Sequence, residues 1–280
     1  MEKEGQQDER KDRVARGPEE WRTNEFSEIG KTLAVMSGKG GVGKSTVTAL
    51  TAVALARAGW KVGILDADIT GPSIPKMFGL KERLVGLEFG LVPAVTRDLR
   101  IEVVSLNLFL DEEDTPVIWR GPLLAGAVRQ FWSEVAWGRL DYLVIDLPPG
   151  TGDVPLSVMQ SVPLDGLLIV SSPQDLAVMV VSKAIKMAKM LGKKIIGLVE
   201  NMGQVVCPRC GETVYPFGRP QGREIAARAG IDFLGGLPVD PGLARLADEG
   251  RIEEYQGPLL AALVDAVGSS LGSPVGDPKG

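Results

Sequence analysis

The sequence of 280 residues contains no histidine and only two cysteines, Cys207 and Cys210. Without an imidazole, general-base and metal-ligand roles pass to carboxylates and thiols. Two cysteines cannot form the disulfide framework of a secreted protein of this length. No apolar run reaches the roughly 20 residues that span a bilayer, and the charged beginning lacks the apolar centre of a signal peptide. These absences predict a cytoplasmic protein with reduced thiols and no membrane partner.

The charge balance is mildly acidic, with a formal net charge of −5 at pH 7. No overall basic field is available to attract nucleic acid, so we expect no nucleic-acid partner. Residues 1–24 and 271–280 are polar and rich in charge or in Gly and Pro. We expect both to be disordered tails around one domain formed by residues 25–270.

Between these tails, short apolar segments alternate with segments of helical periodicity. Strands are expected at residues 31–37, 61–68, 101–106, 141–147, 166–172 and 194–201. Helices are expected within residues 44–59, 121–138 and 175–192. This alternation predicts an α/β fold with a doubly wound, mainly parallel sheet. The functional loops of such a sheet lie at the carboxyl ends of its strands.

A glycine-rich segment, SGKGGVGKST, connects the first expected strand to the first expected helix. It matches GxxxxGK[ST], the phosphate-binding loop of the P-loop NTPases. Its glycines allow backbone N–H groups to surround phosphate oxygens, while Lys44 can reach the β- and γ-phosphates and Ser45 can bind Mg²⁺. The predicted nucleotide-binding residues of this loop are Gly38, Lys39, Gly40, Gly41, Val42, Gly43, Lys44, Ser45 and Thr46.

Aspartates follow two other expected strands. Asp66 and Asp68 end the strand before ITGPSIP, and Asp146 follows the apolar residues YLVI in the Walker B pattern. Carboxylates at these ends can hold Mg²⁺ or orient an attacking water, and without histidine an aspartate is the natural candidate for the second role. The alternative is that Asp66 and Asp68 only stabilise a turn.

The two cysteines form the motif CPRCG. A redox disulfide is disfavoured because thioredoxin-like CxxC motifs lie at a helix N-terminus, whereas inert thiols remain an alternative. A C-P-x-C-G turn points two thiolates at one metal, but Zn²⁺ and iron–sulfur clusters usually take four ligands. With no histidine to complete the set, a two-fold homodimer would supply the second pair. Cys207 and Cys210 therefore predict a metal site that bridges a dimer, with iron–sulfur and zinc both open.

The loop also carries Lys39, which gives it the deviant form KGGxGK of MinD, ParA, nitrogenase iron protein and arsenical-pump ATPases. DADITGPSIP, WRGP (residues 119–122), DYLVIDLPPGTGD and ENM…CPRCG…FG follow it. In this order the motifs resemble the Mrp/ApbC-type ATPases, relatives of the eukaryotic cytosolic iron–sulfur scaffolds, over roughly residues 28–265.

That resemblance implies an ATPase that carries a dimer-bridging [4Fe–4S] cluster and transfers it to apo-proteins. It implies that Lys39 reaches the partner's nucleotide, that Lys44 and Asp68 take part in hydrolysis, and that WRGP lies near the dimer interface. It further assigns Mg²⁺ to Ser45, Asp66 and Asp146, and the adenine to Asn201, Pro238, Val239 and Asp240. The alternative is a MinD/ParA-like ATPase switch with a structural zinc-bridged dimer and no cluster transfer.

Overall fold

The fold is organised around one eight-stranded sheet. The computed structural model describes residues 20–68, 73–81, 83–105, 108, 121–272 and 274. The strand order is β12-β9-β8-β1-β7-β2-β6-β5, and every neighbouring pair is parallel except β5–β6. The bounds are β1 Ser27–Ser37, β2 Val62–Asp66, β5 Ala94–Val95, β6 Glu102–Ser105, β7 Gly138–Asp146, β8 Gly166–Ser171, β9 Ile195–Asn201 and β12 Phe233–Leu237.

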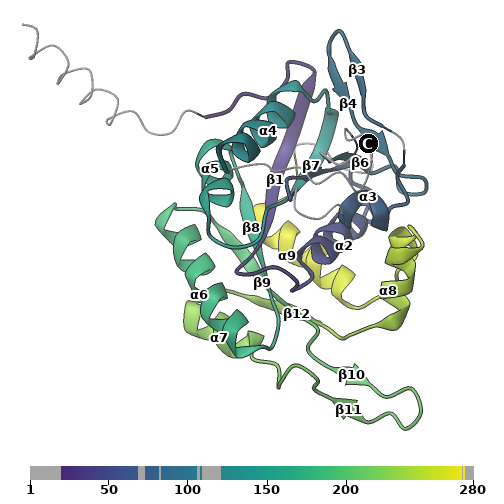
Figure 1. Cartoon of the computed structure of the whole chain (residues 1–280), viewed down its shortest axis with the longest axis vertical. Coiled ribbons are helices and arrows are strands. Elements are labelled where there is room, and N and C mark those ends of the chain that lie inside the picture. Colours follow the sequence, from purple (N-terminus) through teal and green to yellow (C-terminus); the bar gives the residue numbers. More distant parts are fainter. Residues whose placement is uncertain are drawn as a thin grey trace, which may run out of the picture.

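Helices cover both faces of the sheet (Figure 1). They are α2 Lys44–Arg57, α3 Ser73–Met77, α4 Gly121–Glu134, α5 Asp153–Ser161, α6 Asp175–Met190, α7 Gly222–Ala229, α8 Pro241–Asp248 and α9 Leu259–Leu271, with a 3-10 turn at Ile252–Glu254. Successive strand residues point to opposite faces, so Leu33 and Val35 pack with α2 and α9, whereas Ala34 and Met36 pack with α4 to α7. The result is the three-layered, doubly wound α/β fold that the sequence predicts.

The six expected strands and three expected helices are all present, and the structure adds β5, α3, α5, α7, α8, α9 and the elements described below. Residues 135–138 are not helical, because Val135 bridges to Leu91 and Gly138 turns at φ 62° into β7. The strand β12 was not expected, since its sequence FLGGL contains two glycines. Two short antiparallel hairpins, β3–β4 (Val85–Leu87, Gly90–Val92) and β10–β11 (Val205–Val206, Thr213–Val214), were also missed, because strands this short carry no readable periodicity.

Most of the expected tails, residues 1–19 and 275–280, lies outside the described residues, as do Trp119 and Arg120. The domain boundaries and the role of WRGP therefore stay predictions. Trp21, just inside the described part, contacts the body of the protein through the bond from its N–H to the Ser161 carbonyl (2.8 Å). Within the described residues no helix has both the length and the apolar character needed to cross a bilayer.

The parallel register places the predicted site residues at one edge of the sheet. Asp66 lies opposite Asp146 in the β2–β7 pairing, and Val35, just before the phosphate loop, lies opposite Asp146 in the β1–β7 pairing. The same edge receives the end of β9 at Asn201. Since the carboxyl ends of parallel strands meet there, residues far apart in sequence become neighbours.

Candidate functional site

The phosphate loop, residues 38–46, lies between β1 and α2 and is held from two sides. Asn201 donates its side-chain N–H to the Val42 carbonyl (3.0 Å). Gly43 adopts a φ of 83°, and a Cβ atom there would lie 1.9 Å from the Asn201 amide nitrogen. A Cβ on Gly38 would lie 2.6 Å from the backbone of Val180 in α6. Only glycine fits these two positions, so the motif glycines also serve close packing.

Lys44 is buried at the start of α2, with 6% of its surface exposed. Its ammonium lies 2.8 Å from an Asp146 oxygen and 3.1 Å from an Asp68 oxygen. Burial alone would lower the pKa of Lys44, but the nearby carboxylates of Asp146 and Asp68 outweigh it and raise the pKa. The side chain is therefore a fixed, buried cation at the position where the motif places phosphate.

The carboxyl groups of Asp66 and Asp146 belong to neighbouring strand ends close to this cation. Asp66 is 2% exposed; it accepts hydrogen bonds from the Ser105 hydroxyl (2.9 Å) and the Asp68 N–H (3.1 Å). Burial, and then the charge of Asp146, raises the pKa of Asp66 well above its usual range. Two neighbouring carboxylates disfavour ionisation of both groups at once. A bound divalent cation would instead favour the form in which Asp66 and Asp146 are both ionised.

Hydroxyl groups complete this oxygen-rich cluster. Ser45 donates to one Asp146 oxygen (2.5 Å) and Thr48 donates to the other (2.8 Å). Mg²⁺ prefers oxygen ligands of this kind; in the expected set, Ser45 bonds Asp146, and Asp66 lies opposite Asp146 in the β2–β7 pairing. The residues present therefore fit the ion.

The structure brings Lys44, Ser45, Asp66, Asp68 and Asp146 into one site, as the sequence predicts, although their individual roles stay predictions. The turn alternative accounts for the bond from the Asp68 N–H to Asp66, but not for the Asp68 carboxylate against Lys44. Sequence reasoning missed two buried hydroxyls, Thr48 and Ser105. Thr48 could have been found from its position one helical turn after Lys44, whereas nothing in the sequence indicated Ser105.

The Lys39 side chain bonds to a residue of its own chain in this structure. Its ammonium donates to the side-chain oxygen of Gln174, the residue just before α6. Gln174 was not expected at the site, because it follows β8, which carries none of the quoted motifs. The expected reach of Lys39 to a partner's nucleotide stays a prediction.

The residues predicted to hold the adenine lie where β9 and β12 end. The Asn201 oxygen accepts from the Met202 N–H (2.9 Å), which leaves its amide directed at the phosphate loop. The Asp240 carboxylate caps α8 and accepts from the N–H groups of Gly242 (2.7 Å) and Leu243 (3.3 Å). The Asp240 carboxylate is therefore engaged by the helix, and the contact of Pro238, Val239 and Asp240 with a base stays a prediction.

The cysteine motif forms the end of the β10–β11 hairpin, which projects from the body at the bottom of Figure 1. The Cys207 N–H bonds the Glu212 carbonyl (2.9 Å), and the Gly211 N–H returns to the Cys207 carbonyl (2.9 Å). Gly211 closes the turn at a φ of 75°. Both thiols are free; Cys207 is half-buried and Cys210 is exposed. The sequence therefore folds into the tight turn predicted for a metal ligand pair.

The backbone of this turn is directed at the Cys207 sulfur. The N–H groups of Cys210 and then Arg209, followed by the Cys210 thiol, hydrogen-bond that sulfur and lower the pKa of Cys207. Hydrogen bonds to the charged form favour the thiolate, the form that binds metals. Among the described residues, no group of three or more Asp, Glu, Cys or His could hold a metal. The hairpin thus presents two sulfurs, and a metal site with four ligands would need two more.

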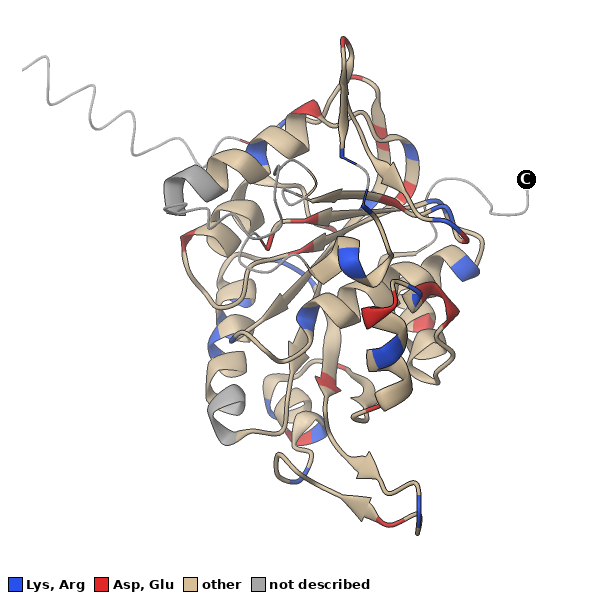
Figure 2. Cartoon of the chain, turned by 45° about the vertical axis from the view of Figure 1, so that its right-hand side comes forward, with Lys and Arg blue, Asp and Glu red and all other residues tan. Residues whose placement is uncertain are grey.

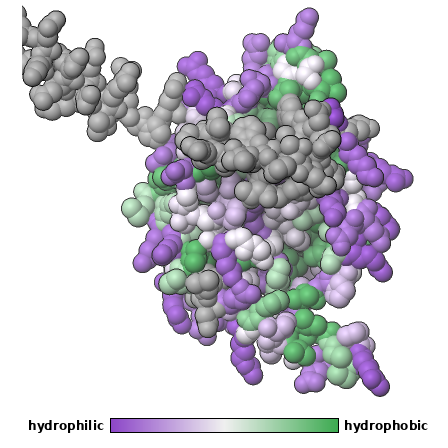
Figure 3. Space-filling model, in the orientation of Figure 1, coloured by the Kyte–Doolittle hydropathy of each residue, from purple (hydrophilic) through white to green (hydrophobic). Residues whose placement is uncertain are grey.

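Apolar side chains surround the two thiols on the hairpin. Val206 is 52% exposed, and Val214 and Phe217 are also exposed. In Figure 3 the lower end of the molecule carries green, hydrophobic atoms beside the hydrophilic tip. Neighbouring exposed apolar groups of this kind are typical of surfaces that another protein covers.

Both ends of the hairpin are anchored at the nucleotide-site edge of the sheet. Before it, the Gln204 carbonyl accepts from the Val239 N–H (2.8 Å), in the predicted adenine segment. After it, the Gln221 N–H donates to the buried Glu200 carboxylate (3.0 Å), next to Asn201. Burial, offset in part by these backbone bonds, raises the pKa of Glu200. Hydrogen bonds on both sides of the hairpin therefore join it to the edge of the sheet that carries the phosphate loop.

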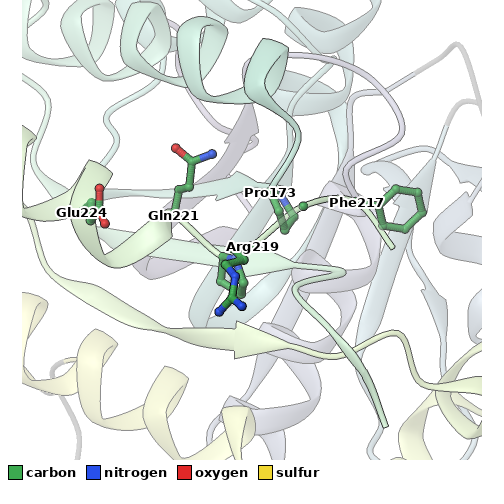
Figure 4. A pocket seen from close by; sticks show the side chains of 7 residues that line it. Pro173, Phe217, Arg219, Gln221 and Glu224 are labelled. Atoms are coloured by element: carbon green, nitrogen blue, oxygen red, sulfur yellow. The ribbon is translucent and has the colours of Figure 1, made fainter. Parts of the chain in front are cut away.

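A hollow of about 430 Å³ separates the returning segment from the loop after β8. Figure 4 shows Pro173 coming from that loop, and Phe217, Arg219, Gln221 and Glu224 coming from the segment between the hairpin and α7. The Arg219 guanidinium lies 5.4 Å from the centre of the Tyr215 ring. This contact packs the returning segment onto the base of the hairpin.

Cys207 should be alkylated at lower pH in the folded protein than in the unfolded protein. Its pKa is lowered by folding, so the thiolate is present below the pH at which an unfolded chain forms it. The measurement is the rate of iodoacetamide modification of the metal-free protein against pH, read at each cysteine by mass spectrometry, with and without denaturant. An equal or higher midpoint for Cys207 in the folded state would contradict the hydrogen-bonded turn.

Comparison with known proteins gives one family match. The model of the ParA family described as NUBPL iron-transfer P-loop NTPase covers residues 28–267. The sequence is 50% identical to an iron-sulfur cluster carrier protein of Methanocaldococcus jannaschii over 228 residues, which are 80% of this chain and 78% of that protein. It is 44% identical to the human cytosolic Fe-S cluster assembly factor NUBP2 over 240 residues, 82% of this chain and 88% of that one.

A solved structure resembles the fold as well. A nucleotide-binding protein of Archaeoglobus fulgidus in complex with ADP superimposes with a TM-score of 0.73 at 50% sequence identity. The match covers 82% of this chain and 90% of that one. At this identity the likeness extends beyond the general fold.

Proposed function

The chain belongs to the family of NUBPL iron-transfer P-loop NTPases, and from this premise we propose that it carries an iron–sulfur cluster and delivers it to apo-proteins. Relatives named as iron-sulfur cluster carriers or cluster assembly factors, at 44% to 50% identity, support this reading. The observation that carries it is the exposed turn of Cys207 and Cys210, whose free thiols are paired on a hairpin anchored at the nucleotide site.

The nucleotide part of the proposal is an ATPase that requires Mg²⁺. The ADP bound to the Archaeoglobus fulgidus relative supports nucleotide binding by the corresponding loop. Lys44 would contact the β- and γ-phosphates, and Asp68 would orient the attacking water. Ser45, Asp66 and Asp146 would hold Mg²⁺, which screens phosphate charge when bound. Lys39 would leave Gln174 and turn to the nucleotide of a partner subunit.

The cargo is proposed to be a [4Fe–4S] cluster shared by two copies of the chain. Each copy supplies Cys207 and Cys210, and four thiolates match the usual ligand number of such a cluster. The exposed apolar residues beside them would be covered in the dimer. Zn²⁺ bound by the same four sulfurs is the competing occupant. The name of the human relative refers to the cytosol, and we propose the same compartment here.

Coupling between nucleotide and cargo would pass through the two anchors of the hairpin. Closure of the loops around ATP would move the end of β9 and the segment at Val239. At the end of β9, Glu200 bonds Gln221 after the hairpin; Val239 bonds Gln204 before the hairpin. The geometry of the paired cysteines would then differ between nucleotide states. This makes cluster holding and cluster release depend on ATP.

The test is anaerobic reconstitution of the purified chain with iron and sulfide, followed by transfer. We expect a brown dimer with about four irons and four sulfides and no zinc. Incubation with an apo-ferredoxin should then restore the ferredoxin spectrum, at a rate that changes when ATP and Mg²⁺ are added. A colourless zinc-bridged dimer that hydrolyses ATP would instead support the MinD/ParA-like switch.

A further inference from the structure

The exposed side of α6 carries several lysines although the whole chain has a net charge of −5. No aspartate or glutamate occurs in residues 176–199, which include the described side chains of α6 and the turn after it. The lysines of this segment are Lys183, Lys186, Lys189, Lys193 and Lys194. In Figure 2 blue positions recur along α6. Helix surfaces usually mix both signs of charge, so this face is unusual for an acidic protein.

A hollow of about 270 Å³ lies on this face, between α6 and α7. Apolar side chains of both helices line it, namely Ile185, Ile225 and Ala229. Its remaining lining residues are Ser182, Lys186, Lys189 and Arg228. The charge of Arg228 is offset by Glu224 (3.1 Å), whereas Lys186 and Lys189, whose ammonium donates to the uncharged Ala229 carbonyl, supply the net positive charge at the hollow.

Long apolar side chains extend the same surface along α6. Met190 is 87% exposed and Met179 is 55% exposed. Methionine is flexible and polarisable, which suits surfaces that adapt to a partner. An exposed stripe of lysine and methionine beside an apolar hollow combines a hydrophobic contact area with a positive field.

We propose that the hollow between α6 and α7 binds an acidic amphipathic helix of a partner protein. Aliphatic side chains at helical spacing on that helix would enter the hollow over Ile185 and Ile225. Its carboxylates would lie against Lys186 and Lys189, which also attract and orient the partner from a distance. Nucleic acid is disfavoured as the occupant, because its charged backbone offers nothing to an apolar floor.

The position of this surface is suited to a protein that also approaches the cysteines. The chain runs from the β10–β11 hairpin into α7, and both lie in the lower part of Figure 1. A partner held at the hollow would therefore contact the helix that follows the hairpin in the chain. Binding itself requires neither cluster nor nucleotide, so this proposal and the proposed function can fail separately.

The test measures binding of a probe peptide to the metal-free full chain by fluorescence anisotropy. The probe is a labelled 20-residue peptide with Leu at helical spacing and Glu elsewhere; the comparison peptides have the same composition in scrambled order, or Ser in place of Leu. We expect the amphipathic peptide to bind at least about tenfold more tightly than either comparison peptide. The double variant Lys186→Glu/Lys189→Glu should weaken its binding at least about tenfold.

The charge-matched control is Lys76→Glu/Lys81→Glu, two exposed lysines outside α6 and α7, which should change the affinity less than about twofold. A thermal melt checks that Lys189→Glu, which removes the bond to the Ala229 carbonyl, leaves the fold intact. The proposal fails if the peptides bind equally, if none binds, or if both double variants weaken binding alike. It also fails if a DNA duplex displaces the peptide at equal concentration. A change of oligomeric state in Lys186→Glu/Lys189→Glu, without peptide binding, would assign the face to a second copy of this chain.

Discussion

The Cys207→Ser variant is expected to lose bound iron and the cluster-bridged dimer together. A hydroxyl does not replace a thiolate toward iron, and in a two-fold dimer one substitution removes two of the four ligands. Iron per protein after anaerobic reconstitution should therefore fall at least about tenfold, with a matching shift to monomer in size-exclusion chromatography. The fold should survive, because the sulfur is at the end of an exposed hairpin.

The matched control is Arg209→Ala, between the two cysteines. It keeps both thiols and the backbone N–H that bonds to the Cys207 sulfur, so iron content should stay near that of the unmodified protein. If Cys207→Ser retained full iron in a dimer, the shared site would be wrong. If it lost iron while the dimer stayed intact without nucleotide, the cysteines would not be what holds the subunits together.

The Lys44→Ala variant is expected to lose ATP binding and hydrolysis. Among the described residues at the phosphate loop, the Lys44 ammonium is the one cation held by two aspartates. Because the site is buried, its contact with a phosphate is strong. We expect the Kd for ATP, measured by isothermal calorimetry, to rise about 100-fold, which corresponds to roughly 2.7 kcal/mol. Hydrolysis should fall below detection at ATP concentrations that saturate the unmodified protein.

The same substitution should lower the stability of the nucleotide-free protein. Without Lys44, the buried carboxylates of Asp146 and Asp68 lose their cation, at a cost of order 3 kcal/mol. Binding is therefore measured at a temperature where circular dichroism shows a folded variant. Lys183→Ala, an equal charge change on the exposed face of α6, serves as the control and should alter neither property.

Lys39→Ala separates the two lysines of the loop. Lys39 contacts only the exposed Gln174 within the described residues, so its loss should leave both stability and ATP affinity nearly unchanged. If Lys39 acts across a dimer, hydrolysis should still be lost.

For the Lys44→Ala variant, normal binding of ATP would show that the loop is not the phosphate site.

The parts of the site that could be predicted are those in which neighbouring residues make the chemistry. Gly43, Lys44 and Ser45 are consecutive, so the motif places them correctly in any fold that puts a strand before them and a helix after them. Asp66, Asp68 and Asp146 could be placed as well, because each follows an apolar strand and parallel strands end at one edge. The pair of Cys207 and Cys210 was readable for the same local reason.

Other contacts could not be predicted, because they depend on which strands are neighbours. Ser105 reaches Asp66 only since β6 lies beside β2, and Gln174 reaches Lys39 only since β8 lies beside β1. Glu200 was not predicted, because the sequence near the end of β9 does not indicate that its carboxylate accepts from the Gln221 N–H at the start of α7.

The sequence by itself therefore determined which groups are neighbours: a phosphate loop, aspartates at strand ends, and two thiols in one turn, from which a divalent-cation site and a shared metal site are predicted. These depend on residue types at short spacing, which survive any arrangement of the remaining chain. The tertiary structure alone decided that both ends of the cysteine hairpin bond to the nucleotide-site edge, and that α6 and α7 enclose an apolar hollow with a basic rim. Such features join segments that are distant in sequence, and only packing determines their distance in space.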